Sequence, residues 1–234
     1  MTMTLPRFYL RSNMNCPFCS ELSTPKNSPY YIAIGQYAGL DSRVLLETEN
    51  WYAIPTLGCL TVGYVLLVCK QHYLSLANLN DSLWDEMLEL KEKVERIIWQ
   101  ELGMPCIAFE HGVTSQDYSG ANSVDHIHLH ILPFHKKAWE LISNKVLPDT
   151  FQILDGYSDL RRHWQSAFPN TYLLFQDVDR SIYYSDDIAD APSQLFRRCL
   201  APLLNADNWN WKEEYYKENI LQTIALFQNQ PKPL

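Results

Sequence analysis

The chain has 234 residues, of which 47% are hydrophobic and 13% aromatic, enough apolar surface for a folded domain with a real core. Its formal net charge of -8 at neutral pH argues against a dedicated nucleic-acid-binding protein, because such proteins present a basic face. No apolar run approaches the length of a membrane span and the N-terminus has no signal-peptide core, so we expect a cytoplasmic protein that partners neither nucleic acid nor membrane.

The first 27 residues are expected to be irregular, and strands are predicted after the loop that follows them. Residues 43–47 and 51–54 are typical of two short strands around a turn at Thr48–Asn50. A more apolar run over residues 62–68 predicts a buried strand that ends near His72. This part of the chain is therefore predicted to be mainly β-structure.

A long amphipathic helix is predicted over residues 83–102. Apolar side chains recur there at the spacing of one helical face, Asn80 and its neighbours supply an N-terminal cap signal, and Gly103 ends the pattern. A strand is predicted next, over residues 106–109, and its continuation at Glu110–Gly112 leads into a polar loop.

Three of the seven histidines, His126, His128 and His130, occupy every second position of an apolar run. This alternation is typical of a strand with one polar face, so the three imidazoles would project from the same side, about 6.5–7 Å from one to the next. Histidine titrates near neutral pH and binds metals, so the row predicts metal ligation, nucleophilic attack or proton transfer. A strand edge that carries histidines by chance is the alternative.

The last hundred residues contain no second histidine row and no second C-x-x-C pair. Arg197 or Arg198 could reach a phosphate, although at least one of them is expected to be solvated on an amphipathic helix. Trp209 and Trp211 could stack on a base, but packing against the terminal helices is the favoured role. The predicted elements are helices near 138–145 and 155–166, a hairpin of 171–175 and 181–184, and helices near 192–204 and 212–228.

The six cysteines are scattered, so no disulfide framework is expected in a reducing compartment. Only Cys16 and Cys19 form a C-x-x-C pair, and they lack the strand-then-helix context of a redox motif. Histidines at strand ends, His72 and His126, could complete a Cys2His2 zinc site. A metal-free knuckle is the alternative reading of the pair.

The segment from His126 to Leu132 matches the pattern His-φ-His-φ-His-φ-φ, where φ is apolar, and it resembles the motif of the histidine triad (HIT) superfamily of nucleotide hydrolases and transferases. The Cys16–Cys19 knuckle, the run from Gly63 to His72 and the loop at Ser119–Ser123 are also similar to HIT proteins, so the resemblance covers roughly residues 14–135. It implies an α+β fold with a HIT-like antiparallel sheet and a long packed helix. Residues 1–136 would form the catalytic domain, and 137–234 a C-terminal α+β extension packed on it.

The resemblance implies catalytic roles for the loop and the histidine row. His128 would attack the α-phosphate of a nucleotide conjugate and form a covalent nucleotidyl-histidine intermediate, which water resolves. His130 would contact the phosphate or the leaving group, and a histidine there goes with hydrolysis where a glutamine goes with nucleotidyl transfer. Ser123, Asn122 and the amides around Gly120 would hold phosphate oxygens, unless the two side chains are only turn residues.

The resemblance also implies a structural zinc ion held by Cys16, Cys19, His72 and His126, and a homodimer. The expected function is a hydrolase of a dinucleoside polyphosphate or a nucleoside phosphoramidate. A nucleotidyltransferase or phosphorylase of the same superfamily is the first alternative, and a non-catalytic nucleotide-binding module is the second.

Three departures from the family pattern bear on the substrate. Tyr64 stands where the family often has a histidine, and Ile54–Leu57 lacks the carboxylate that usually contacts the ribose. Glu110 and His111 stand where an asparagine is common, and a carboxylate there would repel a phosphate unless it is paired or points away. His111 is therefore a candidate substrate-binding residue.

Overall fold

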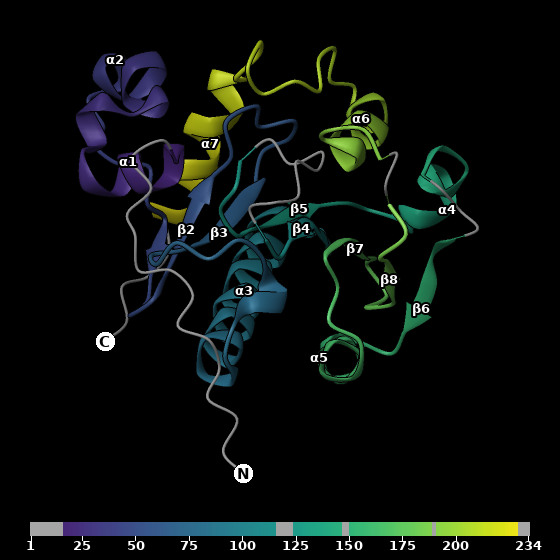
Figure 1. Cartoon of the computed structure of the whole chain (residues 1–234). Coiled ribbons are helices and arrows are strands. Elements are labelled where there is room, and N and C mark those ends of the chain that lie inside the picture. Colours follow the sequence, from purple (N-terminus) through teal and green to yellow (C-terminus); the bar gives the residue numbers. More distant parts are fainter. Residues whose placement is uncertain (1–15, 116–123, 147–149, 189–190, 229–234) are drawn as a thin grey trace.

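The computed structural model describes residues 16–115, 124–146, 150–188 and 191–228. They form an α+β fold around an eight-stranded antiparallel sheet with the strand order β1-β2-β3-β5-β4-β7-β8-β6 (Figure 1). The predicted α+β class is confirmed. The strands are β1 (Leu46–Glu47), β2 (Trp51–Pro55), β3 (Val65–Cys69), β4 (Cys106–Val113), β5 (His128–Pro133), β6 (Gln152–Leu154), β7 (Thr171–Gln176) and β8 (Ile182–Ser185).

Helices lie on both faces of this sheet (Figure 1). The long helix α3 and the shorter α5 cover one face, and α1 and α6 cover the other. The α-helices are α1 (Pro17–Ser23), α2 (Gln36–Ala38), α3 (Asp81–Leu102), α4 (Trp139–Ile142), α5 (Tyr157–Ser166), α6 (Leu195–Leu200) and α7 (Lys217–Gln228). Short 3-10 or π turns are η1 (Pro25–Asn27), η2 (Tyr31–Gly35), η3 (Leu76–Asn78), η4 (Ser143–Lys145) and η6 (Ala201–Leu204). No helix in the described ranges is long and apolar enough to cross a membrane.

The histidine row belongs to β5, which lies between β3 and β4 near the middle of the sheet. Leu129 and Ile131 pack into the core under α3, whereas His128 and His130 face the α1 and α6 side. The strand begins at His128, so His126 precedes it, and the prediction of one strand that carries all three histidines is corrected there. The ladder to β3 ends at His128, because the Ile127 amide donates to the carbonyl of Tyr73 at 2.7 Å, and the ring of His126 lies against Cys16 and Cys19.

The middle of the sheet is longer than the sequence suggests. The strand predicted over residues 106–109 runs on to Val113, because β7 pairs with β4 along residues 108–113. The edge strand β6 escaped prediction: it has three residues, two of them exposed, and only its pairing with β8 marks it as a strand. The turns between residues 17 and 38 also fall in a segment where no helix was expected.

The C-terminal part of the chain continues the same sheet beyond the predicted domain boundary at residue 136. β7 pairs with β4, and β8 and β6 follow it. Helix α7 returns to the turn before β3, where the Thr223 hydroxyl accepts a hydrogen bond from the Gly63 amide at 2.8 Å. The boundary itself stays a prediction, but hydrogen bonds join its two sides.

Candidate functional site

A pocket opens on the sheet face that α1 and α6 cover. His128 and His130 of β5 form its floor together with Phe109 and His111 of β4. Side chains from α1 and α6, with Leu57 and Trp211, form its walls, and most of them are apolar. The arrangement is an apolar cavity with a cluster of imidazoles at its base.

The ring of His128 is held in one tautomer. Its Nδ1 lies 2.6 Å from the carbonyl oxygen of His126. A carbonyl can only accept, so Nδ1 carries the proton and Nε2 carries the lone pair. Burial lowers the pKa of His128, the hydrogen bond to His126 raises it, and the charge of Arg197 lowers it further. The ring is therefore a neutral imidazole with an available Nε2, the form that acts as a nucleophile.

His130 is held by two aromatic side chains. Its ring stacks on Phe109 with centroids 4.4 Å apart, and its Nδ1 lies 2.8 Å from the hydroxyl of Tyr64. Burial, and then the charges of His128 and Arg197, place the pKa of His130 well below its usual value. Tyr64, noted in the sequence only as a departure from the family pattern, thus contacts the histidine row directly.

Glu110 and His111 point to opposite faces of β4, as strand neighbours do. His111 lines the pocket, and its Nε2 is buried with no hydrogen-bond partner among the described residues. Burial, followed by the charge of His128, lowers the pKa of His111 to about 4, so the ring is neutral at physiological pH. Glu110 lies on the other face, where it accepts hydrogen bonds from the Tyr172 hydroxyl and the Leu76 amide. Its carboxylate therefore does not face the pocket.

The remaining predicted phosphate-binding residues, Gly120, Asn122 and Ser123, lie outside the described residues. The next residue along the chain, Val124, lines the pocket.

Two charged side chains in the pocket wall were not predicted as site residues, Glu21 of α1 and Arg43. The buried Arg43 guanidinium donates two hydrogen bonds to the Glu21 carboxylate, at 2.7 Å each, and a third to the carbonyl of Pro55 at 2.6 Å. Through these bonds Arg43 ties α1 to the last residue of β2. Nothing in the sequence signalled it, because the two residues are 22 positions apart and neither belongs to a motif.

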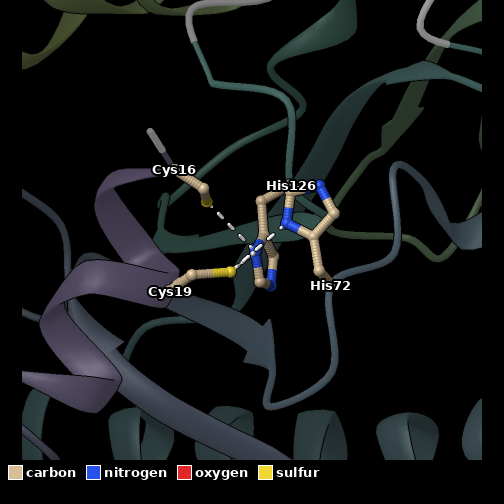
Figure 2. A group of neighbouring side chains, drawn as sticks. All are labelled: Cys16, Cys19, His72 and His126. Carbon is tan, nitrogen blue, oxygen red and sulfur yellow. Dashed lines mark hydrogen bonds between the residues drawn. The ribbon is translucent and has the colours of Figure 1, made fainter. Parts of the chain in front are cut away.

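Beside the pocket, the structure brings Cys16, Cys19, His72 and His126 into one cluster (Figure 2). One ligand atom from each residue lies within 4.8 Å of the other three. The Nδ1 of His126 is 3.3 Å from Cys16 Sγ and 3.5 Å from Cys19 Sγ, and the Nδ1 of His72 is 3.3 Å from Cys19 Sγ. Four donors, from the start of α1, the segment after β3 and the segment before β5, thus converge on one point.

The cluster suits a tetrahedral metal ion in both geometry and protonation. Two sulfurs and two nitrogens around a zinc-sized ion are about 3.5 Å apart, close to the distances found. The Nε2 of His126 donates to the carbonyl of Cys69 at 2.8 Å, which leaves a lone pair on Nδ1, the atom that faces the sulfurs. Burial is the main reason that the pKa of His126 falls to about 3, so this ring is in the neutral form that binds metals.

One family model and several solved structures are similar to parts of this chain. Residues 9–146 match the family described as "Protein similar to CwfJ C-terminal", whereas no curated protein matches. A HIT-family member from Bacillus subtilis is 20% identical with a TM-score of 0.39, and the match covers 65% of this chain and 94% of the Bacillus protein. A Zn-bound histidine triad family protein from Mycobacterium smegmatis is 22% identical with a TM-score of 0.37, over 54% and 78%. A hypothetical histidine triad nucleotide-binding protein from Sulfolobus tokodaii is 17% identical with a TM-score of 0.35, over 44% of this chain and 66% of its own.

Proposed function

The chain belongs to the family of proteins similar to the CwfJ C-terminal region, a HIT-like family, and on that premise we propose that it hydrolyses nucleotide conjugates through His128. One observation carries the proposal. The His126 carbonyl fixes the proton of His128 on Nδ1, so that Nε2 is a nucleophile in a pocket that also holds His130 and His111. The substrate class is a dinucleoside polyphosphate or a nucleoside phosphoramidate.

The proposed reaction has two displacements at the α-phosphorus. His128 Nε2 forms a P–N bond while the bond to the leaving group breaks, and the His126 carbonyl stabilises the positive charge that develops on the ring. His130 contacts the bridging atom of the leaving group, which takes up a proton from solvent water as it departs. A second water molecule then forms a P–O bond and gives a proton back to solvent, the P–N bond breaks with its electron pair returning to His128 Nε2, and a nucleoside monophosphate leaves.

The pocket walls support a nucleoside as the bound group. Phe18, Leu57 and Trp211 supply apolar and aromatic surface above the histidines, where a base can be buried. The carboxylate on this wall, Glu21, is engaged by Arg43, so ribose recognition by a free carboxylate is not part of the proposal.

We also propose that the Cys2His2 cluster binds a structural zinc ion. All four ligands come from the protein, so the ion would have no open position and would act only by holding α1 to His126. The backbone of His126 holds His128, and the cluster therefore supports the nucleophile through one residue. A homodimer and a cytoplasmic location stay predictions.

The deciding experiment looks for a covalent adduct. Purified protein is mixed with a dinucleoside polyphosphate or a nucleoside phosphoramidate, quenched in alkali, and digested for mass spectrometry. We expect a nucleotidyl group on His128, and turnover that falls about 1,000-fold or more in His128→Ala. His135→Ala, which removes an exposed histidine outside the pocket, is the matched control.

The other outcomes would select an alternative. An adduct that passes to added phosphate or sugar phosphate, with no monophosphate released by water, would make the protein a transferase or phosphorylase. Tight nucleotide binding with neither adduct nor product would make it a binding module.

A further inference from the structure

Arg197 brings a positive charge to the pocket from a segment outside the matched family region, which ends at residue 146. Its side chain is 3% exposed and lines the pocket with His128 and His130. The guanidinium donates to the carbonyl of Trp209 at 3.0 Å, to the carbonyl of Gly58 at 2.6 Å and to the hydroxyl of Tyr64 at 3.3 Å. Helix α6 thereby connects to the turn before β3 and to the histidine row.

This guanidinium pairs with no carboxylate in the described part of the chain. The other arginine of the pocket wall, Arg43, is neutralised by Glu21. A buried charge without a counterion is costly, so a site that keeps one is suited to an anion. Three of the five N–H donors of Arg197 have acceptors among the described residues, which leaves two for a ligand.

A glycine, Gly58, makes room for the guanidinium of Arg197. Gly58 has a φ of +67°, and a Cβ there would lie 2.5 Å from Nη2 of Arg197 and 2.6 Å from Cβ of Trp211. Only glycine allows this approach between the turn and the C-terminal segment. The guanidinium therefore contacts the backbone of Gly58 and Trp209 on one side and lines the pocket on the other.

The hydroxyl of Tyr64 links Arg197 to His130. Because Arg197 donates to the Tyr64 oxygen, the hydroxyl proton of Tyr64 is available for His130 Nδ1, 2.8 Å away. Tyr64 is fully buried, so its proton needs that acceptor. His130 Nδ1 then carries the lone pair and Nε2 carries the proton, the reverse of the tautomer of His128.

We propose that the C-terminal segment completes the phosphate site: Arg197 binds a phosphate of the substrate, and through Tyr64 it sets His130 as an Nε2–H donor toward the same group. The inference rests on the proposed function for the identity of the ligand as a nucleotide phosphate. Arg197 touches the ligand, and Tyr64 is a positioning residue. The two histidines thus have complementary roles, because His128 offers a lone pair to phosphorus and His130 donates a hydrogen bond to the phosphate.

The first test measures binding of inorganic phosphate and of AMP to the full chain by calorimetry. Arg197→Gln is expected to weaken both by roughly tenfold or more, since a hydrogen-bonded charge is lost, and Arg197→Lys by less. Arg198→Gln is the matched control: the residue is exposed, is next on the same helix, and stacks on Trp209, so it reports any loosening of the segment. Affinity within twofold of the wild type in a folded Arg197→Gln would overturn the proposal.

The second test reads the His130 tautomer directly. In protein labelled with ¹⁵N-histidine, the ring nitrogen shifts should identify His130 as the Nε2–H form and His128 as the Nδ1–H form. Tyr64→Phe removes one oxygen and should convert His130 to a mixture of tautomers while His128 keeps its form. An unchanged His130 spectrum in this variant would overturn the relay, whether or not Arg197→Gln folds.

Failure of this proposal is distinguishable from failure of the proposed hydrolase. If the wild type forms no adduct and yet binds phosphate in an Arg197-dependent way, the hydrolase is wrong and this site stands. If adduct and turnover are found while phosphate affinity is the same in Arg197→Gln, the hydrolase stands and this site is wrong.

Discussion

The two ends of the histidine row are held by opposite ends of the chain. His126 is held by the N-terminal cluster, in which Cys16 and Cys19 approach it from α1. His130 is held by the C-terminal segment, in which Arg197 reaches it through Tyr64. The first anchor uses soft metal ligands, and the second uses charge and hydrogen bonds. Between them, the tautomer of His128 is set by one backbone carbonyl, that of His126.

The largest expected effect comes from breaking the N-terminal anchor. Cys19→Ala, or a chelator added to the wild type, should remove the metal and lower the free energy of unfolding by about 5 kcal/mol or more, because metal binding is coupled to folding. Metal analysis and urea denaturation measure the two effects. Cys106→Ala removes a cysteine outside the cluster and should retain the metal. A wild type purified without metal, and insensitive to chelator, would contradict this prediction.

Loosening the C-terminal anchor should have the next largest effect. Phe196 of α6 packs against Phe109 and Phe175, with ring centroids 5.2 Å away in each case. Phe196→Ala should lower the free energy of unfolding by about 3–5 kcal/mol, the usual effect of a cavity of that size. Phe168→Ala, at a 60% exposed position, should change it by little. Two separate unfolding transitions would show that the segment folds independently of the sheet.

A pH-dependent effect is expected from the opposite face of β4. Burial, offset in part by hydrogen bonds from Tyr172 and Leu76, raises the pKa of Glu110 from 4.5 to about 8. The folded protein then keeps a proton that the unfolded chain releases above pH 4.5, so this contribution to stability is full below that pH and is lost as the pH rises through about 8.

Glu110→Gln cannot lose a proton. The difference in unfolding free energy between this variant and the wild type should therefore shift in favour of the variant by about 4 kcal/mol between pH 4.5 and pH 8. Urea denaturation across that range measures the difference. The exposed Glu92→Gln should leave the pH dependence unchanged. Parallel curves for Glu110→Gln and wild type would refute the shifted pKa.

The smallest effect is expected at the helix that neither anchor touches. The Asn80 side chain caps α3 by accepting a hydrogen bond from the Leu83 amide at 2.9 Å. Asn80→Ala should lower the free energy of unfolding by about 1 kcal/mol and leave phosphate affinity unchanged. An equal loss of phosphate affinity would show that α3 and the pocket are energetically coupled.

Prediction from the sequence succeeded best where apolar and polar residues recur at a fixed local spacing. The period-two alternation of β5 and the cap and apolar face of α3 predicted both elements, because local spacing decides which side chains are buried. The pairing of the Cys16–Cys19 knuckle with His72 and His126 needed the HIT resemblance as well, and the structure gathers the four residues as expected. The roles of individual site residues stay predictions.

Sequence reasoning was weakest where partners are distant along the chain. Tyr64 and Arg197 are 133 positions apart, and Arg43 and Glu21 belong to no motif. The sequence offered Arg197 and Arg198 as equivalent candidates for a phosphate. Only the fold distinguishes them, because Arg197 is buried against Gly58 whereas Arg198 is exposed.

By itself, then, the sequence determined the alternation of the histidine row and the long helix through local spacing, and its resemblance to HIT proteins implied the α+β class and the four residues of the Cys2His2 cluster. The tertiary structure decided which histidine nitrogen is free and which arginine faces the pocket. Those depend on a single carbonyl, a single hydroxyl and the packing of α6 on the sheet. Hydrogen-bond partners set a tautomer only when they are within about 3 Å, and such proximity between distant residues arises from folding.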